Sequence, residues 1–312
     1  MSPDAQTRSP GRACSAGAHI PRNHHRLPSR RPGEDLPRRK QNIMNPESAQ
    51  AAYLTAITTA LSPTRLRHAF RASRDESETV VLARYFRNLA LCESLYPVLH
   101  VLEITLRNRV DEVMGSAFPA TPPRRRALHA GELPSTGSWL DADPGVLAPG
   151  DREEIGRTKA RAFVQERKAP SSDQVVEGLS LGFWTGLFTR VYEISPRSSY
   201  NPADGKPTAF WPRHLKAVFP HLPRRLRTRQ HVYSVLSELT RLRNLVFHHR
   251  PVWHLKLNPL HTSATGAIGW ISPEVQRTLL HLDRFPAVYN RDADDFVRLV
   301  GRIAAHEPPN SG

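Results

Sequence analysis

Three side chains near the end of one predicted helix, Arg243, Asn244 and His248, have the chemistry needed to handle a phosphodiester. The arginine is a permanent cation that can hold non-bridging phosphate oxygens. The histidine can move protons near neutral pH, and the asparagine can orient either the imidazole or the phosphate. Asn244 and His248 are four residues apart, which places them on one flank of a helix.

The helix that carries these residues is predicted from the spacing of its apolar side chains. They recur three and four residues apart and form one stripe: Val232, Val235, Leu236, Leu239, Leu242 and Val246. Pro251 sets its end, because the ring lacks an N–H donor and disfavours helical geometry at Arg250. At about 100° per residue, Arg243 falls within the apolar arc. A guanidinium at that position must pair with another polar or charged group or line a water-filled cleft, because it cannot lose its charge.

The string from Arg243 to His248, R-N-L-V-F-H, resembles the R-x4-6-H motif of the HEPN superfamily. The longer string LRNLVFHHRPVW resembles the Abi-like, or abortive infection, branch of that superfamily. Residues 95–110, LYPVLHVLEITLRNRV, resemble a block near the start of Abi-like proteins. LSLGFWTGLF at 179–188 resembles a third block, and the Phe210-Trp211 region a weaker fourth. The resemblance covers roughly residues 75–255, with the blocks in the order that the family has.

The resemblance is specific because several blocks occur in the order of the family. The R-x4-6-H motif alone is not specific. The chain has 38 Arg and 15 His, so chance copies are expected, and Arg124 to His129 is one. That copy lies among prolines, has arginine where Asn244 follows Arg243, and has no amphipathic helix around it. We interpret it as a chance match.

The resemblance implies a metal-independent endoribonuclease that needs no cofactor and works as a homodimer with a composite active site. His248 would act as general base or acid when the RNA 2′-hydroxyl attacks the adjacent phosphate. Arg243 would stabilise the charge on the phosphoryl oxygens, and Asn244 would orient His248 or the phosphate. Products would carry 2′,3′-cyclic phosphate and 5′-hydroxyl ends, and DNA would not be cut. Second-rank candidates for RNA contact are His249, Arg250, Arg107 and Asn108.

Other interpretations of the same residues stay open. His248 near a helix C-terminus offsets the helix dipole, and Arg243 can pair with a buried acid such as Glu103. Arg107 can form a structural ion pair, for example with Glu103 four residues before it. Some HEPN proteins bind RNA without cutting it, so a non-catalytic RNA-binding or regulatory dimer is the alternative function. A toxin controlled by a partner antitoxin or small RNA is a further alternative.

Composition limits the class of protein. The 312 residues carry a net charge of +15, which argues for a polyanion partner, most simply nucleic acid. The excess of 38 Arg over 6 Lys also fits a GC-rich genome. Cys14 and Cys92 make neither a disulfide framework nor a zinc site, and no carboxylate cluster predicts a metal. No apolar run is expected to reach membrane-span length, and no signal peptide is predicted, so the expected location is cytoplasmic.

The fold is predicted to be all-α, a single helical bundle of HEPN type. Residues 1–45 form a basic, disordered extension, residues 46–305 the domain and residues 306–312 a loose tail. Met44 is the favoured start of translation. Helices are expected at 47–61, 66–70, 75–93, about 95–113 with Pro97 as its start or as a kink, 151–168, 172–191, 210–219, 223–250, 272–285 and 292–305. Residues 117–151, 195–208 and 252–271 are expected to be irregular. Glycines 178, 182 and 186 predict a close helix–helix approach.

Overall fold

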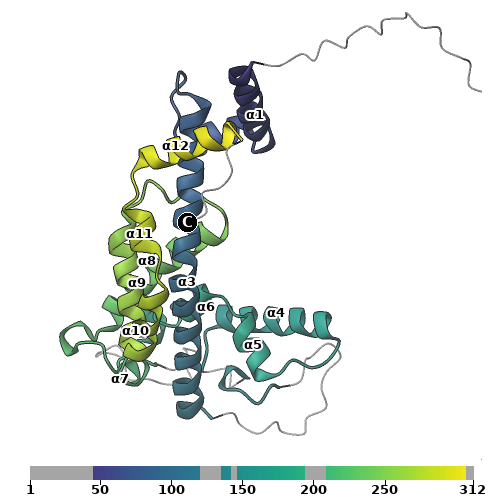
Figure 1. The fold of residues 1–312 in the computed structure, drawn as a ribbon. Helices are drawn as coiled ribbons and strands as arrows, with labels where there is room; N and C mark the ends of the chain where they lie inside the picture. Colours follow the sequence, from purple (N-terminus) through teal and green to yellow (C-terminus); the bar gives the residue numbers. More distant parts are fainter. Residues whose placement is uncertain (1–44, 120–134, 142–145, 194–208, 307–312) are drawn as a thin grey trace, which may run out of the picture. The chain divides into compact units, whose positions relative to one another are not determined.

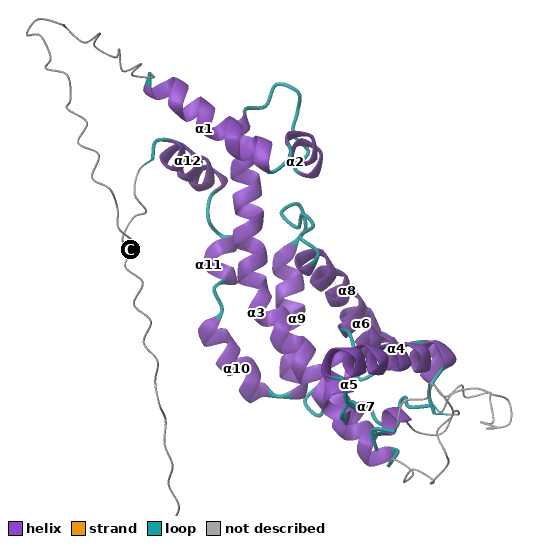
Figure 2. Cartoon of the chain, turned by 90° about the vertical axis from the view of Figure 1, so that its right-hand side faces the viewer, coloured by secondary structure: helices purple, strands orange, loops and turns teal. Residues whose placement is uncertain are grey.

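The computed structural model describes residues 45–119, 135–141, 146–193 and 209–306. They belong to a unit that begins at Asn45. The predicted extension up to Met44, Cys14, the Arg124–His129 string and the tail after His306 lie outside the described residues. Within the described ranges the regular elements are helices, with one isolated β-bridge between Glu193 and Trp211 and no strand (Figure 2). The all-α prediction is confirmed.

The helices follow one another in the order shown in Figure 1. Their bounds are α1 Pro46–Ala60, α2 Pro63–Ala69, α3 Glu78–Ala117, η1 Trp139–Asp141, α4 Pro149–Glu166, α5 Ser172–Gly178, α6 Leu181–Gly186, η2 Arg190–Tyr192, α7 Leu215–Val218, η4 Arg224–Leu226, α8 Arg229–Phe247, α9 Leu257–Ile271, α10 Pro273–Leu282, α11 Phe285–Tyr289 and α12 Ala293–Ala304.

α3 is the helix on which the others pack, and three successive stretches of it enter three buried clusters. Its first turns, residues 81–83, pack with α2 and α12. Residues 91–102 pack with the second half of α8 and with α9, α10 and α11. Residues 106–114 pack with the segments between residues 139 and 226 and with the first half of α8. Burial of each large apolar side chain stabilises the folded state by about 1.5–3 kcal/mol. Because α3 contributes to all three clusters, it holds together the elements that carry the site described below.

Pro97 does not start a new helix, because α3, which is 40 residues long, runs through it. A proline inside a helix costs about 3 kcal/mol, because it removes one backbone donor. The side chains on both sides of Pro97 offset this cost, since Leu95, Val98 and Leu99 are at most 2% exposed. Tertiary packing therefore keeps one helix where local propensity predicts two.

The single helix predicted over residues 172–191 is wrong, because the chain breaks into α5, α6 and η2. Leu179 is extended, and the Ser180 hydroxyl accepts a hydrogen bond from the Phe183 N–H, which starts α6 afresh. Gly178 consequently shares no helix face with Gly182 and Gly186. Only Gly178 is at a close approach, since an added Cβ would lie 2.6 Å from Thr158 Cγ2 of α4.

Residues 252–271 are largely helical, contrary to the expectation of irregular structure. α9 is rich in Gly, Ser and Thr, which hide the helical pattern in the sequence. Its small side chains let it pack closely, because Ala264, Ala267 and Ile268 are fully buried on α3 and α8. Two other predicted boundaries also move: α7 is shorter than 210–219, and α8 begins at Arg229 rather than at Pro223.

The expectation that no stretch reaches membrane-span length needs a correction. α3 is long and apolar enough to cross a membrane by length and composition alone. The central helix of a packed domain has the same composition, and 39% of its most apolar window is buried within the unit.

His261 and Asp283 form a buried contact that predicts a pH dependence of stability. Nε2 of His261 lies 2.8 Å from Oδ2 of Asp283, and the two side chains are 8% and 6% exposed. Burial lowers the pKa of His261, and the charge and hydrogen bond of Asp283 oppose this effect more weakly. The folded state therefore binds this proton less readily than the unfolded chain does, so acidification below pH ~6.5 should lower the free energy of unfolding.

We expect this loss between about pH 7 and about pH 5 to shrink in His261→Gln, which keeps a hydrogen-bond donor but does not titrate. Urea unfolding at a series of pH values measures it. An equally steep loss in both proteins would show that other groups cause it.

Candidate active site

α8 positions the three predicted catalytic residues. The Thr228 hydroxyl accepts a hydrogen bond from the His231 N–H and caps the first turn. The predicted apolar stripe is confirmed as the buried face, with Val232, Leu236, Leu239, Leu242 and Val246 in the core. Arg243 lies at the edge of this face. Asn244 is on the exposed side, and His248 is the C-cap residue that follows Phe247, the last residue of α8.

Arg243 is held by a carboxylate and an aromatic ring. Its Nε lies 3.0 Å from Oε2 of Glu103, and its Nη2 lies 3.4 Å from Oε1. Its guanidinium carbon lies 4.2 Å from the centre of the Phe247 ring. The Arg243 and Glu103 side chains are 21% and 16% exposed. The partner that a cation on an apolar helix face requires is therefore Glu103, as one interpretation of the sequence named it.

Glu103 joins three helices, α3, α6 and α8. Besides Arg243, its Oε1 accepts a hydrogen bond from the Leu181 N–H at the start of α6. The hydroxyls of Thr185 and Thr240 lie 2.9 Å apart and also join α6 to α8. Three segments that lie far apart in the sequence, 95–110, 179–188 and 231–253, thus meet at this carboxylate.

Arg107 and Asn108, the second-rank candidates on α3, have other contacts. Arg107 does not pair with Glu103; its Nη2 lies 4.0 Å from Oε1 of Glu177, and its Nε donates to Oδ1 of Asn108. The Arg107 side chain is 18% exposed, whereas Asn108 is on the surface. These contacts favour the structural interpretation of Arg107.

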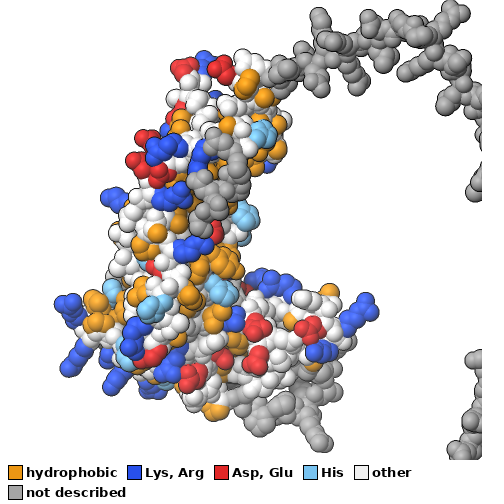
Figure 3. Space-filling model, viewed as in Figure 1, with side chains coloured by type: hydrophobic (Ala, Val, Ile, Leu, Met, Phe, Trp, Pro, Cys, Tyr) orange, Lys and Arg blue, Asp and Glu red, His pale blue; other side chains and the backbone are white. Residues whose placement is uncertain are grey.

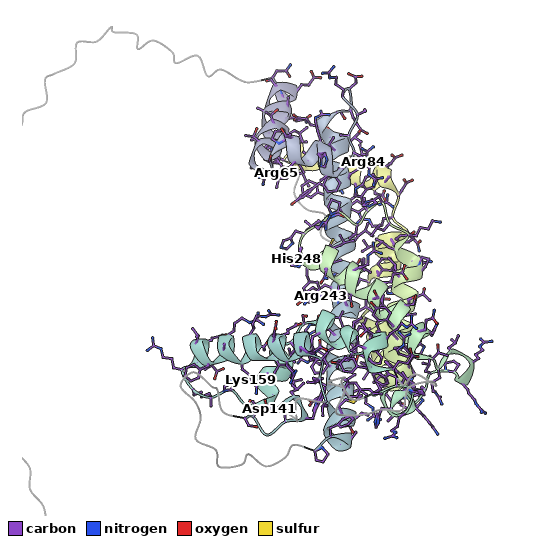
Figure 4. All side chains as sticks on the ribbon, turned by 180° about the vertical axis from the view of Figure 1, so that it is seen from behind. Arg65, Arg84, Asp141, Lys159, Arg243 and His248 are labelled. Atoms are coloured by element: carbon purple, nitrogen blue, oxygen red, sulfur yellow. The ribbon has the colours of Figure 1, made fainter. Side chains whose placement is uncertain are left out.

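The end of α8 exposes two adjacent imidazoles. His248, His249 and Arg250 are all exposed, and Figure 4 shows Arg243 and His248 close together on one side of the unit. The His249 N–H donates to the Val246 carbonyl and the Arg250 N–H to the Leu245 carbonyl, the pattern of a Schellman cap. His249 occupies the position where such caps usually have glycine, with φ of 56°. A side chain there costs about 1–2 kcal/mol.

The segment after the motif is anchored to α3 by Asn88, which sequence reasoning missed. Oδ1 of Asn88 accepts hydrogen bonds from the N–H groups of Val252 (2.7 Å) and Trp253 (3.1 Å). The Trp253 ring stacks on the Phe70 ring (centroids 6.4 Å apart), and the Arg84 guanidinium lies 5.5 Å from its centre. The signal in the sequence was an amide among the apolar residues of the first half of α3.

Asn88→Ala should lower the free energy of unfolding by about 2 kcal/mol, because it leaves the buried Val252 N–H and the partly buried Trp253 N–H without a partner. Urea unfolding measures the loss. Asn88→Asp keeps the accepting oxygen and should retain more of the stability, and Asn108→Ala on the exposed face of α3 is the matched control. Equal stability of the Asn88→Ala and Asn108→Ala proteins would contradict the anchoring role.

A row of stacked rings, also missed by sequence reasoning, lies beside the motif helix. Tyr96 stacks on His100 (centroids 5.7 Å apart, planes at 11°) and on Phe247 (5.1 Å, 18°). Arg243 lies on Phe247 and continues the row. Tyr96 is 49% exposed, and His100 is on the surface. Exposed rings next to cations suit the stacking of nucleobases. The i, i+4 spacing of Tyr96 and His100 was the available signal.

The surface next to Tyr96 is apolar and contains a pocket. A pocket of 470 Å³ is lined by Leu89, Cys92, Glu93, Ser94, Tyr96, Pro97, Val246, Leu282 and Arg284. Burial raises the pKa of the Cys92 thiol to about 11, so this thiol is a poor nucleophile at neutral pH. Within the described ranges, no three His, Cys, Asp or Glu side chains come together as a metal site.

Comparisons with protein-family models, with curated proteins and with solved structures found no match.

Proposed function

We propose that this protein is a metal-independent endoribonuclease with a helical bundle of HEPN type, acting in phage defence or as a toxin. One observation carries the proposal. The exposed His248 and Asn244 lie one turn apart at the end of α8, beside an Arg243 guanidinium that Glu103 and Phe247 hold in place. A proton-transfer group, an amide and a fixed cation on one surface suit phosphodiester cleavage.

In the proposed reaction, His248 removes the proton of an RNA 2′-hydroxyl. The 2′-oxygen attacks the adjacent phosphorus, the bond from phosphorus to the 5′-oxygen breaks, and the leaving oxygen takes a proton from an imidazolium. In a composite site, the second copy of His248 supplies that proton. The products are a 2′,3′-cyclic phosphate and a 5′-hydroxyl. No cofactor is needed, because every proton moves between side chains and substrate.

Arg243 keeps donors for the phosphate despite its ion pair. An arginine has five N–H donors, and Glu103 engages Nε and Nη2. Nη1 makes no hydrogen bond among the described residues, so its two N–H groups are available. Glu103 then acts as a positioning residue, because it fixes the plane of the guanidinium and neutralises part of its charge.

The exposed apolar surface beside the motif supports a homodimer. Leu89, Tyr96 and Leu282 are 53%, 49% and 68% exposed around the pocket, and Val246 of the motif helix lines it. Exposed apolar clusters of this kind are typical of interaction surfaces. We expect the wild type to sediment as a dimer and Leu89→Ser/Leu282→Ser to sediment as a monomer that cuts RNA more slowly. A monomeric, fully active wild type would rule out the composite site.

A single 2′-deoxy nucleotide tests the reaction class. Once a cleavage position in a labelled RNA is known, replacing the 2′-hydroxyl on its 5′ side by hydrogen should stop cleavage there while neighbouring positions are still cut. Gel analysis of the products, with the all-RNA oligonucleotide as control, measures this. Cleavage that persists at the deoxy position would exclude the 2′-hydroxyl as nucleophile.

A second candidate function is a non-catalytic RNA-binding or regulatory dimer. The Arg243–Glu103 ion pair favours it, because a neutralised guanidinium stabilises a growing negative charge less. The proposed location is the cytoplasm, and an antitoxin or small RNA is a proposed further partner. Binding of RNA without cleavage under any condition would support this second function.

A further inference from the structure

A second surface, at the opposite end of α8, is strongly basic. Residues 209–237 contain six Arg or Lys residues, three His residues and no Asp or Glu. Four of these cations are exposed: Arg213 and Lys216 around α7, and Arg224 and Arg225 in η4. We call these four side chains the α7–η4 surface. Figure 3 shows Lys and Arg side chains gathered at the lower left, over the region where Figure 1 labels α7.

The backbone that carries the α7–η4 surface is fixed by other arginines. Arg229, 8% exposed, donates to Oε2 of Glu193 (2.9 Å) and to the Phe188 carbonyl (3.1 Å). Nη2 of Arg227 donates to the Leu222 carbonyl (2.7 Å). Arg109 of α3 donates twice to the Ala217 carbonyl at α7, at 2.9 and 2.6 Å. The four exposed cations therefore project from a braced segment.

No carboxylate among the described residues neutralises these four cations within ion-pair distance. Two acids near this segment belong to other arginines: Glu112 pairs with Arg109 at 2.7 Å, and Glu274, which lies near His221, pairs with Arg277 at 3.3 Å. Burial, and then the charge of Arg213, lowers the pKa of His214. Like charges that repel one another on a rigid surface are stabilised when a polyanion covers them.

We propose that the α7–η4 surface binds the phosphate backbone of single-stranded RNA and holds the strand whose other part reaches Arg243 and His248. This inference rests on the proposed function and adds a binding surface remote from the motif. Three of the four cations are arginines, whose forked donors match phosphate oxygens. None of the exposed large apolar side chains of the described residues comes from 209–237. A membrane surface, into which apolar side chains insert, is therefore favoured less.

The geometry sets a minimum length for such an RNA. α8 has 19 residues and is about 28 Å long at 1.5 Å per residue. A stacked strand advances about 3.4 Å per nucleotide, so about eight nucleotides are needed to reach from η4 to His248. Shorter RNA can occupy only one of the two surfaces.

The test compares two full-length variants with a parent protein that carries His248→Ala, so that the RNA stays intact. Both variants also carry His248→Ala. One carries Arg213→Ala, Lys216→Ala, Arg224→Ala and Arg225→Ala. The matched control loses four dispersed exposed arginines through Arg65→Ala, Arg74→Ala, Arg157→Ala and Arg302→Ala. The probes are labelled single-stranded RNAs of about 30 and about 4 nucleotides, chosen on either side of the length limit, in EDTA at several salt concentrations.

Each phosphate contact adds about 0.7 to the slope of log affinity against log salt for a single strand, so four contacts add about 2.8. Between ~50 and ~200 mM salt, the parent should therefore lose about 50-fold more affinity for the long RNA than the α7–η4 variant does. The control variant should behave as the parent, and the α7–η4 variant should differ less from it with the short RNA, which can occupy only one of the two surfaces.

Equal salt slopes for the α7–η4 variant and the control variant would overturn the proposal, even if the wild type cuts RNA. The proposal would also be overturned if the parent bound no RNA but bound vesicles containing phosphatidylserine, and the α7–η4 variant lost that vesicle binding. Loss of RNA binding in the α7–η4 variant together with a wild type that never cuts RNA would support this surface and contradict the nuclease. The two proposals therefore fail separately.

Discussion

RNA cleavage by the His248→Ala protein should be about 10²–10⁴-fold slower than by the wild type, the loss typical of removing a general acid–base group. The stability should not change. The His248 side chain is exposed and makes no hydrogen bond within the described ranges, and only its backbone N–H takes part in the helix end. Cleavage rates and thermal unfolding of the same preparations measure the two effects.

The control for His248→Ala is His281→Ala, which removes an exposed imidazole from α10. The control should cut RNA at the wild-type rate. A His248→Ala protein that cuts as fast as the control would place the proton-transfer group elsewhere, with His249 the first residue to examine. An unfolded His248→Ala protein would mean that the imidazole is structural.

Glu103→Ala should lower the free energy of unfolding by about 3 kcal/mol, the largest stability loss that we expect in this region. The substitution removes both hydrogen bonds to Arg243 and the one from the Leu181 N–H, and it leaves a guanidinium that is four-fifths buried without its carboxylate. Urea unfolding measures the loss, and Glu177→Ala, whose partner Arg107 is 4.0 Å away, is the control. A loss below about 1 kcal/mol would show that the ion pair is weak.

Glu103→Gln separates the structural role of Arg243 from its role on RNA. The amide oxygen can still accept the Leu181 N–H but no longer neutralises the guanidinium. Removing one negative charge near a bound phosphate is worth about 1 kcal/mol, so RNA should bind about fivefold more tightly although the protein is less stable. Weaker RNA binding by a folded Glu103→Gln protein would contradict a phosphate contact of Arg243. Arg243→Ala alone cannot decide this, because it also leaves Glu103 without its partner.

The sequence predicted well the elements that bury a regular apolar stripe. The buried face of α8, the caps at Ser272 and Asp292 and the all-α class follow from local spacing and capping chemistry. It failed where tertiary packing decides. α3 passes through Pro97 because the flanking side chains are buried, and α9 forms although its small residues carry a weak helical pattern.

The candidate site was predictable residue by residue along α8 but not across helices. Arg243 shows from one sequence window that it needs a partner, whereas the choice of Glu103 depends on the packing of α3 against α8. The Asn88 hydrogen bonds and the Tyr96–Phe247 stack join residues more than 150 positions apart, and the periodicity of a sequence does not reveal such contacts. The α7–η4 surface is visible in the sequence as charge, but its braces are visible only in three dimensions.

The most direct measurement is incubation of the full-length protein with labelled RNA in EDTA, beside the His248→Ala protein, with analysis of the product ends. We expect the wild type alone to cut, and to leave 2′,3′-cyclic phosphate and 5′-hydroxyl ends. Cleavage only after divalent metal is added, products with other ends, or equal cleavage by the His248→Ala protein would contradict a metal-independent active site at His248.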